Sequence, residues 1–124
     1  MLTRDLMLKD VITTNGNSSV QDVIELLFKR HIGCIVIVND MKECIGIFTE
    51  RDVIRIVAQN ISLDVTIDEV MTTNPFTINE EAPFEEARSI LKTHKIRYLP
   101  VISANGKLSG LISIRYILSE LCDM

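Results

Sequence analysis

The feature that most constrains this fold is an internal repeat, because a chain that encodes two similar halves must pack two similar units. Residues 8–15 align with residues 67–74 at an offset of 59, and both segments end in Thr-Thr-Asn. From residue 20 onward the offset is 64, which places Gly46 opposite Gly110. This alignment predicts five extra residues in the second copy, within 75–83, and a trimmed loop in the first copy.

Apolar spacing within each copy alternates between the helical period and the strand period. It predicts two helices with apolar stripes over 20–27 and 84–91, and closing helices at 50–58 and 114–121. It predicts strands at 34–38, 44–48, 98–102 and 108–112, after a short extended segment around Thr13 or Thr77. A copy of about 60 residues buries too little apolar surface alone. We therefore expect an α+β fold in which two β-α-β-β-α repeats, 1–62 and 63–124, pack sheet to sheet.

The composition excludes several classes of protein. The 124 residues carry a net charge of -4, with 5% aromatic residues and no Trp, whereas nucleic-acid binding needs a basic face or stacking rings. The longest apolar run, 34–38, is too short to cross a bilayer. The first residues mix both charges, unlike a secretory signal, so we expect a cytoplasmic protein without membrane or nucleic-acid partners.

No group of residues typical of catalysis or metal binding is present in the sequence. Cys34, Cys44 and Cys122 form no metal-like pair and are expected to be buried, inert thiols. His31 and His94 share no ligand spacing with each other or with a cysteine, and each is expected to end a helix. No nucleophile elbow accompanies a serine or cysteine. We therefore expect neither an enzyme nor a metal site.

Three sequence segments carry a resemblance to a known family. They are Gly-Ile-Phe-Thr-Glu-Arg-Asp at 46–52, Val-Met-Thr-Thr-Asn-Pro at 70–75 and Ile-Arg-Tyr-Leu-Pro-Val at 96–101. In this order they resemble a tandem pair of cystathionine-β-synthase-type (CBS) domains, the Bateman module, over nearly the whole chain. The resemblance implies the α/β-type CBS fold with an internal pseudo-twofold axis, two clefts between the repeats, and disc-like homodimers. It also implies regulatory binding of adenosine-containing ligands such as AMP, ADP, ATP or S-adenosylmethionine.

The chemistry of residues 46–52 fits a nucleotide site but also has a simpler explanation. Free amides at the start of the following helix favour a phosphate. The Asp52 carboxylate can accept both ribose hydroxyls, the Thr49 hydroxyl can donate to a ribose or phosphate oxygen, and Arg51 can supply phosphate charge. The same Thr-x-x-Asp spacing is also a capping box, in which both side chains only satisfy helix amides. Both interpretations stay open.

The resemblance implies two ligand sites, one for each repeat. The first is expected to comprise Ile12, Thr14, Gly33, Cys34, Ile47, Thr49, Arg51 and Asp52. The second is expected to comprise Thr73, Pro75, Arg97, Tyr98, Leu111, Ser113 and Arg115. In the second site Tyr116 stands where the first has its carboxylate, and a phenol cannot chelate two hydroxyls. We expect the second site to be empty, weaker, or suited to a different ligand pose.

Two functions are compatible with these residues. The first is a stand-alone regulatory module that needs no cofactor, binds AMP, ADP or ATP in the cleft between its repeats, and acts on a separate effector protein. The second is a ligand-free dimerisation or adaptor module in which the motifs survive only as helix caps. In both cases the large apolar fraction, 47% of the residues, predicts a homodimer formed along the helices.

Overall fold

The computed structural model describes residues 1–122, with side chains as far as residue 120. The chain divides into two compact units, each with its own core. The first unit is the continuous segment Ile12–Asn74. The second unit combines Met1–Val11 with Pro75–Met124.

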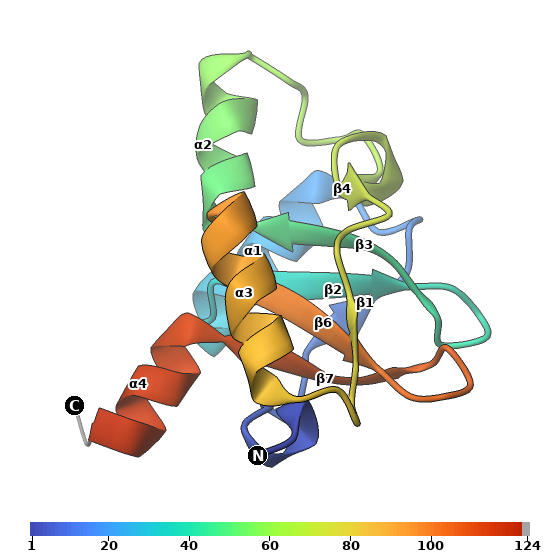
Figure 1. The fold of residues 1–124 in the computed structure, drawn as a ribbon. Coiled ribbons are helices and arrows are strands. Elements are labelled where there is room, and N and C mark those ends of the chain that lie inside the picture. Colours follow the sequence, from blue (N-terminus) through green and yellow to red (C-terminus); the bar gives the residue numbers. More distant parts are fainter. Residues whose placement is uncertain (123–124) are drawn as a thin grey trace. The chain divides into compact units, whose positions relative to one another are not determined.

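The first unit is a four-stranded sheet with two helices (Figure 1). Its strands, in the spatial order β1-β2-β3-β4, are β1 (Thr13–Thr14), β2 (Cys34–Val38), β3 (Cys44–Thr49) and β4 (Thr72–Thr73). Strands β1 and β2 are parallel, and the other two pairs are antiparallel. The helices are α1 (Val20–Arg30) and α2 (Glu50–Ala58), with a 3-10 turn at Ile67–Glu69.

Local sequence explains why these elements form and how they pack. The Ser19 hydroxyl caps α1 by accepting a hydrogen bond from the Asp22 N–H at 3.1 Å. His31 then ends the helix in the left-handed conformation, with φ of 53°. One face of the sheet and the apolar stripes of both helices form the core, whose buried residues are Val20, Val23, Leu27, Ile35, Ile37, Phe48, Ile56, Ile67 and Val70.

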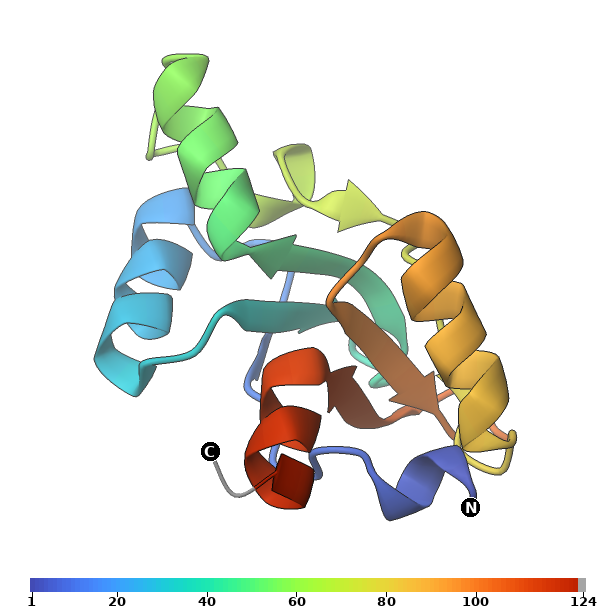
Figure 2. The same cartoon turned by 60° about the vertical axis from the view of Figure 1, so that its left-hand side comes forward.

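The second unit repeats this arrangement (Figure 2). It contains a 3-10 turn at Thr3–Asp5, then β5 (Ile78–Asn79), α3 (Phe84–His94), β6 (Tyr98–Ile102), β7 (Leu108–Ser113) and α4 (Ile114–Cys122). Strand β6 lies between β5, which is parallel to it, and β7, which is antiparallel. The buried core residues are Ile78, Ala87, Leu91, Leu99, Val101 and Ile112.

The predicted fold class is confirmed: residues 1–122 form an α+β structure with two sheets and four α-helices. Strands β2 and β6 and helix α2 have the bounds that the apolar spacing predicts. Helices α1 and α3 continue past their apolar stripes and end at the predicted histidines, with His31 as the C-cap of α1 and His94 as the last residue of α3. Packing of one sheet on the other stays a prediction.

The predicted change of offset between the repeats is wrong. Strand β1 runs parallel to β2, whereas β4, which carries the matching Thr-Thr pair, runs antiparallel to β3. The structural counterpart of β1 is β5, parallel to β6 in the second unit. The 3-10 turns at Thr3–Asp5 and Ile67–Glu69 correspond at an offset of 64. A single offset therefore relates the repeats throughout, with no trimmed loop, and the shared Thr-Thr-Asn does not mark structurally equivalent residues.

The compact units differ from the sequence repeats 1–62 and 63–124 because each repeat gives its first segment to the other unit. The N–H of Leu8 donates to the Leu111 carbonyl at 2.8 Å, and the reverse hydrogen bond measures 3.0 Å. In the same way β4 pairs with β3 in the first unit. We call these two first segments, which contain Met7 and Met71, the crossing segments. Each packs on a glycine of the neighbouring strand, since a Cβ at Gly46 would overlap the Met71 side chain and a Cβ at Gly110 the Met7 side chain.

None of the helices formed by residues 1–122 combines the length and the apolar character that crossing a bilayer requires. The predicted burial of the cysteines holds for Cys34, while Cys44 is half-buried, and both are free thiols. The side chain of Cys122 lies outside the described residues.

Candidate functional site

The junction between β3 and α2 places a carboxylate at the N-terminus of a helix. Asp52 is the third residue of α2, and its Oδ2 atom accepts a hydrogen bond from the Thr49 N–H at 2.9 Å. The Thr49 hydroxyl donates to the same oxygen at 3.3 Å. The helix dipole stabilises a negative charge at this position. The capping-box geometry predicted from the Thr-x-x-Asp spacing is therefore present.

A third contact to this carboxylate comes from Arg55, one turn further along α2. Its Nη2 atom lies 3.5 Å from Asp52 Oδ1 and donates a 2.6 Å hydrogen bond to the Val70 carbonyl. The Asp52 side chain keeps only 15% of its surface exposed, and that of Arg55 38%. Arg55 is not among the site residues predicted from the sequence. The spacing of three residues between acid and base was the available signal, since such residues are neighbours on a helix.

The end of β2 lies beside this junction. Cys34 pairs with Thr49 across the antiparallel ladder, and the Gly33 carbonyl accepts a hydrogen bond from the Glu50 N–H at 3.1 Å. Burial is the main cause that raises the pKa of the Cys34 thiol, and the negative charges of Cys44 and Asp52 raise it further. The thiol is therefore a neutral, weakly polar neighbour of the carboxylate.

The alternation of side chains along the strands divides the predicted first site. Cys34, Ile47 and Thr49 lie on the face of the sheet opposite the core, next to Asp52. Ile12 packs against the core instead, and Thr14 pairs with the core residue Ile37 and hydrogen-bonds the Ser18 hydroxyl at 2.5 Å.

Two further residues near the first site are Thr13 in β1 and Arg51 in α2. Thr13 was predicted to be extended but was not included in the site. It pairs with Val36 and lies on the same face of the sheet as Ile47. Arg51 lies on α2 with an exposed side chain. The structure thus brings together Gly33, Cys34, Ile47, Thr49 and Asp52, and it places Ile12 and Thr14 on the other face.

The second unit has the same junction with different chemistry. The Ser113 hydroxyl accepts a 3.3 Å hydrogen bond from the Tyr116 N–H, a simple helix cap with no carboxylate. Tyr98 pairs with Ser113, and the Arg97 carbonyl accepts from the Ile114 N–H at 3.1 Å. The equivalent predicted residues therefore gather here, with Leu111 in β7 and the side chains of Arg97 and Arg115 exposed.

Thr73 and Pro75, which the resemblance assigned to the second site, belong to different compact units. Thr73 lies in β4 and pairs with Gly46 in the first unit. Pro75 begins the part of the chain that belongs to the second unit. At the uniform offset of 64, the counterparts of Ile12 and Thr14 are Phe76 and Ile78. Thr73 and Pro75 stay predicted members of the second site.

The carboxylate at the first junction has room for a ligand hydroxyl. An ionised carboxylate offers about four acceptor positions, and the Thr49 amide, the Thr49 hydroxyl and Arg55 occupy three. Two vicinal hydroxyls need two positions. One of the four acceptor positions is already free. If the Thr49 hydroxyl rotates towards the ligand, it frees a second position on the carboxylate and can itself donate to a ligand oxygen. The junction can therefore bind a diol without losing the backbone cap.

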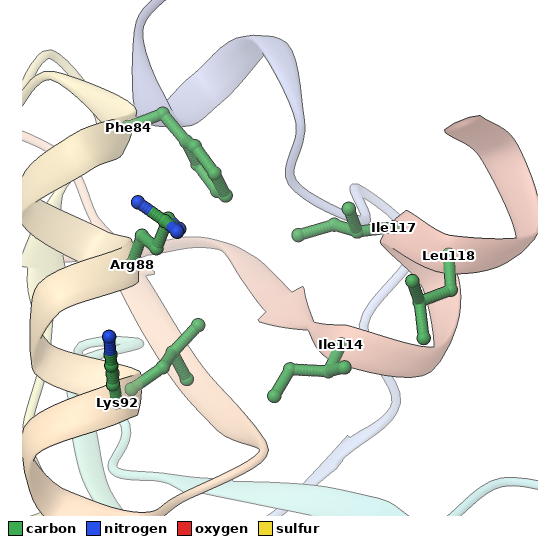
Figure 3. Close-up of a pocket in the computed structure, with 7 residues that line it drawn as sticks. Phe84, Arg88, Lys92, Ile114, Ile117 and Leu118 are labelled. Carbon is green, nitrogen blue, oxygen red and sulfur yellow. The ribbon is translucent and has the colours of Figure 1, made fainter. Parts of the chain in front are cut away.

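A separate apolar pocket of about 310 Å³ lies between α3 and α4 of the second unit. In Figure 3 the side chains of Phe84 and Ile117 point toward each other across it, while Arg88 and Lys92 extend from α3. It contains none of the predicted site residues; its lining consists of Phe84, Arg88, Leu91, Lys92, Ile114, Ile117 and Leu118. Its apolar lining fits a hydrophobic contact better than a charged nucleotide.

Within residues 1–122, no group of three or more histidine, cysteine or acidic side chains lies close enough to hold a metal ion. His31 ends α1 as its C-cap, as predicted. His94 is the last residue of α3, and its ring stacks on Phe76 with ring centroids 3.9 Å apart.

The sequence model of the CBS domain family matches the chain twice, at residues 4–59 and 67–123. An uncharacterized protein from Methanopyrus kandleri is 36% identical over 112 residues, which are 89% of this chain and 57% of that protein. The inosine-5'-monophosphate dehydrogenase of Korarchaeum cryptofilum is 37% identical over 110 residues, which are 88% of this chain but only 22% of that enzyme.

Two solved structures are similar over almost their whole length. One is the CBS domain pair of protein MJ0100 in complex with 5'-methylthioadenosine and S-adenosyl-L-methionine; its TM-score is 0.87 at 28% identity, over 99% of this chain and 96% of that chain. The other is the CBS domain protein PAE2072 from Pyrobaculum aerophilum complexed with AMP, with a TM-score of 0.87 at 27% identity, over 100% of both chains.

Proposed function

Because this chain belongs to the CBS domain family, with one domain in each repeat, we propose that it is a regulatory module that binds an adenosine-containing ligand at the junction of β3 and α2. The observation that carries the proposal is the Asp52 carboxylate, held at a helix N-terminus beside Thr49. Such a carboxylate accepts the ribose hydroxyls, and the positive end of the α2 helix dipole favours a phosphate or another anionic group nearby.

The similar solved structures support this choice of ligand class. The MJ0100 domain pair was solved with 5'-methylthioadenosine and S-adenosyl-L-methionine, and PAE2072 with AMP. These ligands share the adenosine moiety and differ in what is attached to the 5' carbon. A site that recognises the ribose diol through Asp52 accommodates that variation. We propose AMP, ADP or ATP as the regulatory ligand.

The proposed output is a change in the module that an effector protein senses. The relative from Korarchaeum cryptofilum is an inosine-5'-monophosphate dehydrogenase of which this chain matches 22%, so the homologous segment is a minor part of that enzyme. We propose that this chain likewise regulates and does not itself catalyse. Such coupling requires that the ligand bind one state of the module more tightly than the other.

A thermal shift experiment with AMP, ADP, ATP, NAD and S-adenosylmethionine tests the proposal. A ligand present at 100 times its dissociation constant stabilises the folded state by about 2.7 kcal/mol, which raises the melting temperature by at least several degrees. At least one of the five compounds should produce this shift. If none does at millimolar concentration, the proposal is wrong.

One observation favours a second function, a ligand-free dimerisation or adaptor module. All three contacts of the Asp52 carboxylate lie within the chain, and they already give it a structural role as a helix cap. The second repeat keeps a cap at Ser113 without any carboxylate. Under this alternative, no adenosine compound shifts the melting temperature.

A further inference from the structure

Arg55 belongs to none of the residue sets expected to touch a ligand, yet it contacts the carboxylate at the centre of the proposed site. We infer that Arg55 is a positioning residue, which orients Asp52 so that the carboxylate accepts the ribose hydroxyls. The inference rests on the proposed function and adds to it the residue that sets recognition of the ribose. Three observations carry it: the anchoring of Arg55, the sharing of contacts on the carboxylate, and the comparison of the two repeats.

Arg55 is held in place from outside its own helix. Its Nη2 atom donates a 2.6 Å hydrogen bond to the carbonyl of Val70, in the segment between the 3-10 turn Ile67–Glu69 and β4. A short hydrogen bond from a charged donor is among the stronger contacts in proteins. The adjacent residue, Met71, packs over Gly46 in β3. The guanidinium therefore has a fixed place from which it meets Asp52 Oδ1 at 3.5 Å.

The contacts on Asp52 divide between its two oxygens. Both Thr49 groups bind Oδ2, whereas Oδ1 meets Arg55. When the Thr49 hydroxyl turns to a ligand, the Thr49 amide and Arg55 are the two remaining contacts. The amide binds Oδ2 and Arg55 meets Oδ1, so together these two contacts determine the rotation of the carboxylate plane. Without Arg55 the plane can turn about the axis through Oδ2, and it no longer presents two acceptors to a diol.

The two repeats provide an internal comparison. At the offset of 64, Asp52 corresponds to Tyr116 and Arg55 to Ser119, so both members of the pair are replaced together in the second repeat. A pair that merely stabilised a helix would suit α4 as well as α2. The chain also has an ordinary surface pair with the same spacing on α3, between Glu85 and Arg88, at 3.3 Å.

Burial separates these two ion pairs. The side chains of Glu85 and Arg88 are 80% and 65% exposed, against 15% and 38% for Asp52 and Arg55. An exposed pair contributes little to stability or to the orientation of its members. The matched pair on α3 therefore provides a control for the loss of an arginine in an i,i+3 pair.

The test compares the affinities for AMP and 2'-deoxy-AMP by isothermal titration calorimetry. The variants are Arg55→Ala, Arg55→Lys and the matched control Arg88→Ala. The wild-type chain should prefer AMP by about tenfold, the equivalent of one lost hydrogen bond to a charged group. Arg55→Ala should bring the ratio close to one, Arg55→Lys should restore part of it, and Arg88→Ala should leave it unchanged.

Two results would overturn the inference in distinguishable ways. If Arg55→Ala keeps the wild-type ratio, the side chain has only a structural role, while the proposed function stands. If the wild-type chain binds neither nucleotide nor any other compound of the thermal shift experiment, the proposed function fails together with the role of Arg55. If it binds one of the other compounds instead, the same comparison with that compound and its 2'-deoxy form tests Arg55. Circular dichroism melting checks that each variant folds, and Arg55→Met, which keeps the apolar stem, replaces Arg55→Ala if that variant does not fold. A wild-type ratio in Arg55→Met contradicts the inference equally.

Discussion

At the scale of single residues, Asp52 combines a structural and a proposed functional role in one carboxylate. It caps α2 through the Thr49 amide, and it is the acceptor through which we propose that the ribose binds. These roles respond differently to substitution, since a cap can be lost at a moderate cost in stability whereas a chelating carboxylate has no substitute. The second repeat illustrates this with Ser113, which caps α4 alone.

Asp52→Ala should abolish the nucleotide-induced thermal shift while lowering the free energy of unfolding by about 1 kcal/mol, the usual cost of a lost cap. The matched control is Ser113→Ala, which removes the corresponding cap hydrogen bond in the second repeat. Urea denaturation measures the stability, and thermal shift with AMP measures binding. If Asp52→Ala keeps the full shift, the carboxylate does not bind the ligand.

Burial of Cys34 predicts an alkaline loss of stability. Because its pKa is raised, the thiol stays neutral in the folded protein, whereas the unfolded chain ionises near 9.0, the ordinary value. Above that pH the unfolded state binds fewer protons, so the free energy of unfolding falls as the pH rises. Urea denaturation between pH 7 and pH 10 should record this fall. Cys34→Ala should reduce it, and an unchanged slope in that variant would argue against the assignment.

Local sequence patterns predicted the contacts between residues close in the sequence, but they missed those between residues far apart. The Thr-x-x-Asp spacing was sufficient for the capping geometry because its contacts span three residues. The hydrogen bond between Arg55 and Val70 joins positions 15 apart, which no local pattern reports. Thr14 was expected in the first site from the resemblance alone, and its position opposite the core residue Ile37 depends on the pairing of β1 with β2, which no local pattern reports.

At the scale of elements, close packing of a crossing segment explains the glycine shared by β3 and β7. The Met71 side chain occupies the place where a Cβ at Gly46 would lie. At Gly110 the obstacles are the Met7 side chain and, 2.8 Å away, the backbone oxygen of Leu8. A side chain can move or be truncated, but a backbone oxygen paired in a sheet cannot.

Gly46→Ala should lower the free energy of unfolding by about 1–3 kcal/mol, the usual cost of overpacking. The same substitution should cost less in a Met71→Ala background, because the three atoms nearest to the added Cβ all belong to that side chain. Gly110→Ala should stay costly even with Met7→Ala. Urea denaturation of the single and double variants measures the coupling energy of Gly46 with Met71 and that of Gly110 with Met7. Equal costs of Gly46→Ala in both backgrounds would contradict the packing account.

The first eight residues should stabilise the second unit. The Thr3 hydroxyl and amide both donate to the Ala82 carbonyl at 2.8 Å, and Leu8 exchanges two backbone hydrogen bonds with Leu111. Removal of residues 1–8 should therefore increase hydrogen exchange in β7, while exchange in β2 of the first unit changes less. Equal protection of β7 with and without these residues would show that the segment is dispensable.

Periodicity predicted the long elements well because their apolar stripes are set by burial on one face. Strand β2 and helix α2 have the predicted bounds. Residues 8–15 were aligned wrongly because they carry no apolar stripe that would fix their counterpart in the second repeat. Those residues form two-residue strands and turns, whose pairing depends on partners such as Leu111, about a hundred positions away.

At the scale of the whole molecule, exposed apolar side chains lie on helices of both units. Ile54 in α2 is 71% exposed, and Leu118, its counterpart in α4 at the offset of 64, is 47% exposed. Each unit therefore exposes an apolar helix position that contact with a second copy can bury. We therefore keep the prediction of a homodimer formed along the helices.

Replacement of both Ile54 and Leu118 by Asp should convert the dimer to a monomer, because a desolvated carboxylate in an apolar interface is strongly unfavourable. Sedimentation velocity at micromolar concentration measures the mass. Ala104→Asp, in the exposed turn between β6 and β7, is the control and should stay dimeric. A wild-type chain that sediments as a monomer would contradict the prediction.

The most direct test of the central claim is an NMR titration of the labelled chain with AMP. If the junction of β3 and α2 binds the nucleotide, the largest amide shifts should be at Gly33, Cys34 and residues 49–52, and Asp52→Ala should abolish them. The absence of any saturable shift at millimolar AMP, or the same shifts in Asp52→Ala, would contradict the account.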